Sequence, residues 1–115
     1  MKWLCFLWCA GALMADGRAA PPWEKPADTA LVGGNLFREY CAVCHDVDRD
    51  QAGTRKIGPS LHHLFKNPKL PLSKGRPNRG YVMVRIHYGG PVMPAFMKKI
   101  DNAQMAALLT YLESK

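Results

Sequence analysis

Acidic residues are absent from one long stretch of this 115-residue chain. Positions 51–100 contain ten lysines and arginines but no aspartate or glutamate, and the formal net charge of the whole chain is +7. A one-sided positive field steers encounter with an acidic partner, and it does so in a salt-dependent way. The simpler alternative is a solvated basic surface. Internal repeats and low-complexity tracts are also lacking, and the length predicts one domain.

A secretory signal is predicted over residues 1–20. Lys2 precedes a nearly uninterrupted apolar run, and small residues suit cleavage near Ala19 or Ala20. The run is too short for a comfortable membrane span, and the alternative is an uncleaved N-terminal anchor. Export predicts the periplasm, where nucleic acid is not an expected partner. The proline-rich residues 21–27 are expected to form an extended arm.

Cysteine is scarce. The chain has four cysteines, and two of them, Cys5 and Cys9, lie in the predicted signal. Neither follows the small residue that a lipid-attachment site requires, so a lipoprotein is not predicted. If the signal is removed, Cys41 and Cys44 are left, and they are too few for a disulfide framework.

The remaining cysteines belong to the segment Cys41-Ala42-Val43-Cys44-His45, which has the spacing of the attachment signal for a c-type haem. Each thiol can add to one vinyl group of the porphyrin, and His45 then lies beneath the ring, where its imidazole can bind iron. A covalent haem would also supply apolar surface to a mature domain of about 95 residues, which buries only a modest core. Two alternatives are a thiol–disulfide redox pair, which favours a βαβ setting, and half of a zinc site, which needs four ligands.

A first helix is expected to begin at Asp28 or Thr29, both of which are good N-caps. It runs to Cys41, and Gly33, Phe37 and Cys41 follow one another at intervals of four on one drifting helical face. Because Gly33 has no side chain, another helix can approach closely there.

A further helix is predicted over residues 79–88, with Asn78 as its cap and Gly89-Gly90 as its end. By propensity alone, the centre of this segment could also be a strand. The connection over residues 66–79 shows no periodicity, and a loop of this length is usually functional; it could wrap the haem edge.

The last helix is expected to begin after Asp101, with Gln104 in capping-box position. Its periodicity predicts one apolar face, made of Met105, Leu108, Leu109 and Leu112.

Met93 is the favoured second iron ligand, because Pro91 and Pro94 hold it in a rigid, non-helical turn after two glycines. A thioether is a soft ligand that favours ferrous iron and suits electron transfer. Methionines at helical spacing are more often core filler, and the histidines are more simply explained as surface or hydrogen-bonded residues. These competing candidates are Met83, Met97, Met105, His62, His63 and His87.

Four pieces of the chain, in this order, resemble the class I cytochromes c, which are small monohaem electron carriers. They are Gly33 and Phe37 with the Cys41–His45 motif, residues 58–65, residues 93–96 and residues 108–112. The resemblance implies an all-α class I cytochrome c fold over residues 28–115, with three to five helices wrapped around one covalently bound haem. It also implies that Gly33 and Phe37 pack against Leu108 and Tyr111 where the terminal helices cross.

The resemblance also implies the roles of five residues. Cys41 and Cys44 would hold one haem c, His45 would be the proximal ligand and Met93 the distal one. Pro59 would offer its carbonyl to the outer imidazole nitrogen of His45. With both axial positions closed, the implied function is one-electron transfer and not catalysis at an open iron site. The alternative is a haem c subunit held permanently in a larger periplasmic oxidoreductase complex.

A monomer is expected, with redox proteins that present an acidic docking face as its partners and an anionic membrane surface as a second candidate. The basic residues expected to frame the haem edge are Lys66, Lys69, Lys74, Arg76, Arg79, Lys98 and Lys99.

Overall fold

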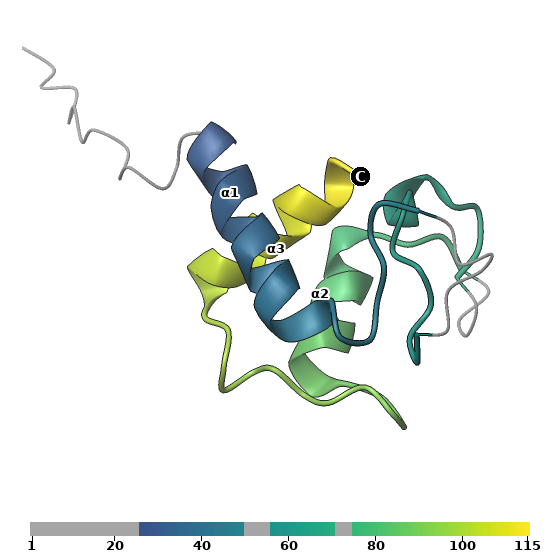
Figure 1. Ribbon diagram of the computed structural model, residues 1–115. Helices are drawn as coiled ribbons and strands as arrows, with labels where there is room; N and C mark the ends of the chain where they lie inside the picture. Colours follow the sequence, from purple (N-terminus) through teal and green to yellow (C-terminus); the bar gives the residue numbers. More distant parts are fainter. Residues whose placement is uncertain (1–25, 50–55, 71–74) are drawn as a thin grey trace, which may run out of the picture.

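The computed structural model describes residues 26–49, 56–70 and 75–115, and this part of the chain is helical and contains no strand. The elements are α1 (Pro26–Leu36), the π turn η2 (Phe37–Cys41), the 3-10 turn η3 (Leu64–Lys66), α2 (Arg79–Tyr88) and α3 (Asn102–Glu113). In Figure 1, α1 crosses α3, and the connection from α2 to α3 runs along the lower edge of the view. The predicted all-α class is therefore confirmed. The described residues include no helix long and apolar enough to cross a membrane.

The first helix begins earlier than its sequence signals predict. α1 starts at Pro26, two residues before Asp28, so an extended arm that reaches residue 27 is wrong for its last two positions. Proline suits the first position of a helix, because the N–H that it lacks would have no partner there. The predicted signal over residues 1–20 and the rest of the arm lie outside the described residues.

The crossing of α1 and α3 depends on Gly33. A Cβ atom at this position would lie 2.3 Å from the carbonyl oxygen of Ala107 and 2.6 Å from the Cβ of Tyr111. One turn later the rings of Phe37 and Tyr111 pack with their centroids 5.8 Å apart. The close helix approach predicted at Gly33 is therefore confirmed.

The core lies between α3 and the elements around it. The predicted apolar face of α3 is confirmed, because the exposed fraction of each of its four side chains is at most 3%. Burying a side chain of this size contributes about 1.5–3 kcal/mol. The buried residues that α2 and the segment before α3 add to this core are Val82, Ile86, Phe96 and Ile100.

Side-chain caps fix where α2 and α3 begin. The Oδ1 of Asn78 accepts a hydrogen bond from the backbone N–H of Tyr81 at 2.9 Å, and residues 79–88 form a helix and not a strand. Asp101 and Gln104 bond reciprocally at 2.8 and 3.0 Å, as the capping box predicts. The starts of both helices were therefore predictable from the local sequence.

The connection between η3 and α2 is described only in part. The backbone N–H of Leu70, a buried residue, donates to the carbonyl of Gly75 at 3.0 Å, which closes the loop at its base. Residues 71–74 lie outside the described part, so a role at the haem edge stays a prediction.

Replacing Gly33 with alanine is expected to destabilise the haem-loaded protein by about 1–3 kcal/mol, because the new methyl group meets backbone atoms that cannot move alone. Denaturant unfolding measures the change in the free energy of unfolding. The matched control is Gly34→Ala, whose Cβ would meet only ring carbons of Tyr111, at 3.2 Å or more, and which gains helix propensity. Equal losses for the two variants would contradict this account of the crossing.

Candidate haem site

The Cys41–His45 segment forms a closed turn at the end of η2. The N–H of Ala42 donates to the carbonyl of Phe37 at 2.9 Å, which is the wide spacing of a π turn. The N–H groups of Cys44 and His45 both donate to the carbonyl of Cys41, at 3.0 and 2.9 Å. Cys41 is thereby buried, and Cys44 and His45 are half-buried beside it.

The two thiols differ from a redox-active pair. Burial, with a smaller contribution from the charge of Cys44, raises the pKa of the Cys41 thiol to about 11. A nucleophilic cysteine in a thiol–disulfide enzyme has a lowered pKa instead. The described residues also bring no cluster of three or more histidine, cysteine or carboxylate side chains together as zinc ligands. The site therefore does not favour either alternative to haem attachment.

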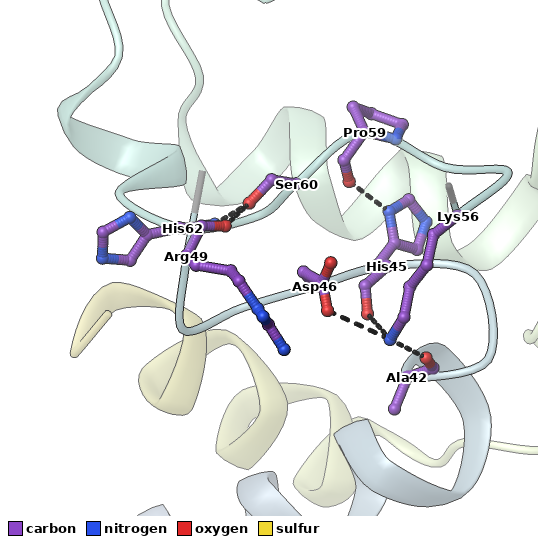
Figure 2. Close-up of polar contacts among 8 residues, drawn as sticks. All are labelled: Ala42, His45, Asp46, Arg49, Lys56, Pro59, Ser60 and His62. Carbon is purple, nitrogen blue, oxygen red and sulfur yellow. Dashed lines mark hydrogen bonds and ion pairs between the residues drawn. The ribbon is translucent and has the colours of Figure 1, made fainter. Parts of the chain in front are cut away.

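His45 meets Pro59 as expected. Figure 2 shows the imidazole facing the Pro59 carbonyl, with 2.7 Å between Nδ1 and the oxygen. A carbonyl oxygen only accepts, so Nδ1 carries the proton and Nε2 keeps its lone pair. Among the described residues Nε2 has no hydrogen-bond partner. This tautomer and orientation fit an imidazole that binds a metal through Nε2.

Gly58 provides the space for this imidazole. A Cβ atom on Gly58 would lie 2.3 Å from Cε1 and 2.5 Å from Nδ1 of the His45 ring. The Gly58 N–H also donates to the carbonyl of Cys44 at 2.7 Å, which holds the two segments together. Sequence reasoning included Gly58 only as part of a resembling segment and missed its contact with the ring.

Lys56 was also missed as a site residue. Its ammonium group donates to the carbonyl oxygens of Ala42 at 2.5 Å and His45 at 3.2 Å, and it lies 3.1 Å from the Asp46 carboxylate (Figure 2). A cation is favourable beside the free carbonyls at the end of a helix. In the sequence, Lys56 is one of ten basic residues at positions 51–100, and nothing in the sequence distinguishes it from the others.

The segment after Pro59 continues alongside the segment after His45. The N–H of Leu61 donates to the carbonyl of Asp46 at 2.7 Å, and the Ser60 hydroxyl donates to the carbonyl of Arg49. His62 and His63, two of the competing ligand candidates, stack on each other with their ring centroids 3.7 Å apart.

Met93 lies in a backbone turn that is attached to α2. Gly89, with φ of 72°, ends the helix, and the N–H of Gly90 donates to the carbonyl of Met93 at 2.9 Å. The N–H of Phe96 reaches back to the carbonyl of Ile86 at 3.0 Å. Met93 is half-buried and packs against the core.

The other described methionines have different surroundings. Met83 and Met97 are 38% and 51% exposed, while Met105 is sealed in the core at 2%. Met93 and His45 lie on separate loops.

A comparison with known proteins identifies the family. Residues 28–112 match the family described as cytochrome C oxidase, cbb3-type, subunit III. The chain belongs to this family of c-type cytochrome domains. The resemblance to c-type cytochromes is thereby confirmed, and membership implies a covalently bound haem c. In this cytochrome, Cys41 and Cys44 are the described cysteines that fit such an attachment.

A curated relative supports the same family over a shorter stretch. Cytochrome c of Gibberella zeae is 54% identical over 33 residues, which are 29% of this cytochrome and 29% of the relative. The match thus spans less than a third of either chain. No solved structure matches the cytochrome significantly.

Replacing Gly58 with alanine is expected to displace the His45 ring and so to weaken any bond that its imidazole forms with a haem iron. Loss of a partner that orients a metal ligand typically lowers affinity about 10- to 100-fold. Haem content per polypeptide, the ferric absorption spectrum and the reduction potential measure the effect. The control is Gly80→Ala, where a Cβ would approach only the Asn78 side chain, at 3.3 Å. An unchanged spectrum and potential in Gly58→Ala would contradict the contact.

Proposed function

We propose that this cytochrome carries one electron at a time on a single haem c, with His45 and Met93 as the two iron ligands. The observation that carries the proposal is the 2.7 Å hydrogen bond from His45 Nδ1 to the Pro59 carbonyl, which leaves Nε2 unprotonated, with a lone pair that can bind iron. The bound haem would supply an iron that exchanges single electrons with little change in its coordination.

The chain's own residues would set how that iron behaves. The Pro59 carbonyl raises the donor strength of the imidazole and fixes its tautomer. The thioether of Met93 would favour the ferrous state and raise the potential relative to a second histidine. If His45 and Met93 both bound the iron, they would leave no position for a substrate, as a carrier requires.

The proposed partners are redox proteins with an acidic docking face. We place the encounter in the periplasm, to which this cytochrome would be exported. The supporting feature is charge: no acidic residue occurs in residues 56–70 and 75–100. Arg79 differs from the other expected rim residues because it pairs with Glu113, and Lys74 lies outside the described part. Arg79 is exposed like the other described rim residues, which are Lys66, Lys69, Arg76, Lys98 and Lys99. An anionic membrane surface would engage the same charges.

A second candidate is a haem c subunit held permanently in a larger oxidoreductase complex. It is favoured by three exposed β-branched side chains, Val43, Ile57 and Val92, which are 79%, 74% and 76% exposed. Each directly precedes a residue of the proposed site, and apolar surface there suits a lasting interface. The family's description as an oxidase subunit points the same way. If the cytochrome co-purifies with a partner at high salt, the permanent subunit is favoured. If it purifies without a partner, the carrier is favoured.

Replacing Met93 with alanine is expected to open the sixth iron position. The ferrous protein should then bind carbon monoxide, the reduction potential should fall, and the near-infrared band assigned to methionine bound to ferric iron should vanish. Absorption spectra and a redox titration provide the measurements. Met97→Ala is the control, since that side chain is 51% exposed. If the band persists in Met93→Ala, another residue is the ligand.

Reversing the charges of Lys98 and Lys99 to glutamate is expected to slow electron exchange with the physiological partner and to leave the potential almost unchanged. Rim charges act mainly on association rate, and screening at 0.15 M salt acts over about 8 Å. Stopped-flow electron transfer against ionic strength measures the effect. The control carries the same reversals at Arg38 and Arg49, which are exposed but lie outside the basic stretch. If the electron-transfer rate of wild type and of every variant does not change with ionic strength, the proposal of a partner with an acidic docking face is wrong.

A further inference from the structure

Arg85 lies on α2, one turn before the proposed distal ligand turn, and its side chain is half-buried. Its Nη1 donates to the carbonyl of Gly89 at 3.3 Å, and its Nη2 donates to the Tyr81 hydroxyl at 3.1 Å. The guanidinium carbon also lies 5.7 Å from the centroid of the Tyr81 ring. Two acceptors and an aromatic ring thus fix the position of this guanidinium.

We propose that Arg85 is a positioning residue that holds the turn carrying Met93 in place and so keeps the Met93 thioether bound to iron. The inference rests on the proposed function, because it takes Met93 as the distal ligand. It assigns to one basic residue of the 51–100 stretch a role inside the molecule, in place of a role in docking.

A single peptide unit links Arg85 to Met93. The carbonyl of Gly89, which accepts from Arg85, and the N–H of Gly90, which donates to the Met93 carbonyl at 2.9 Å, belong to the same planar peptide. Rotating this peptide would break both hydrogen bonds together. The guanidinium therefore fixes the plane that holds the backbone of Met93, and the two bonds strengthen each other by polarisation.

Gly90 provides an independent observation. Among the described glycines only Gly89 has a positive φ, so the backbone conformation does not require glycine at position 90. A Cβ atom on Gly90 would, however, lie 2.6 Å from Nη1 of Arg85. The lack of a side chain at this exposed position is explained by the space that the guanidinium occupies.

The chemistry of the contact calls for arginine. The two acceptors are a neutral carbonyl and a neutral hydroxyl, and Arg85 forms no ion pair with any described residue. A planar fork reaches both acceptors at once, which the single ammonium of lysine does not reproduce. Lysine would nevertheless keep the positive charge near the turn, so the two effects can be separated.

The test compares Arg85→Met, Arg85→Lys and Gly90→Ala with the wild-type holoprotein. All three should raise the apparent affinity of the ferrous protein for carbon monoxide about tenfold, because losing a hydrogen bond to a charged group increases the population with Met93 detached. The near-infrared band of the ferric protein should weaken in parallel. The potential should fall further in Arg85→Met than in Arg85→Lys, because only the first variant also removes the charge.

Two reference variants make the outcome decisive. Arg79→Met removes an arginine of the same helix that bonds to Glu113 instead, and it should leave carbon monoxide binding and the band unchanged. Met93→Ala defines the state in which the sixth iron position is fully open.

If Met93→Ala loses the band while the Arg85 and Gly90 variants bind carbon monoxide like wild type, the role of Arg85 is overturned and the proposed function stands. If Met93→Ala keeps the band, the ligand assignment fails and the role of Arg85 fails with it. Gly90→Ala retains Arg85 and so provides a separate test if Arg85→Met does not fold.

Discussion

The hydrogen bond between the His45 ring and the Pro59 carbonyl constrains two segments of the chain at once. The histidine must follow directly after the second cysteine, and the carbonyl must come from a stiff turn that passes close to it. This proximity is possible because Gly58 has no side chain to fill the space beside the ring. The Lys56 ammonium group also donates to the carbonyls of Ala42 and His45. The segment around His45 is therefore held by hydrogen bonds to backbone carbonyls of Pro59, Ala42 and His45 itself.

The proposed distal side follows a related principle on a different element. α2 ends in a glycine at positive φ, and the turn after it is bonded back to the end of that helix by its own backbone. In both places a basic side chain donates to a backbone carbonyl. Lys56 also pairs with the Asp46 carboxylate, whereas Arg85 also donates to the Tyr81 hydroxyl. Lys56 and Arg85 belong to the stretch without acidic residues, so part of that charge serves local structure and the rest is available at the surface.

Local chemistry made much of the fold predictable. The capping box at Asp101, the Asn78 cap and the apolar periodicity of α3 each report on residues within a few positions, and each is found in the structure. The close approach at Gly33 was predictable, because a glycine inside a helix is not needed for a turn and usually indicates that another element packs closely against it. Gly58 and Arg85 were not predictable, because their contacts depend on where other segments pass in space. The early start of α1 at Pro26 was missed because two better caps follow it.

The π turn η2 has a consequence for how the first helix meets the core. In an α-helix, four residues advance about 40° beyond a full rotation, so positions spaced by four drift steadily around the axis. Four residues of a wider π turn fall short of a full rotation and turn the sequence back. Gly33, Phe37 and Cys41 straddle the change from α1 to η2, and all three are buried. The wide turn thus corrects the angular phase of the helix, so the residues that contact α3 and the buried Cys41 share one face.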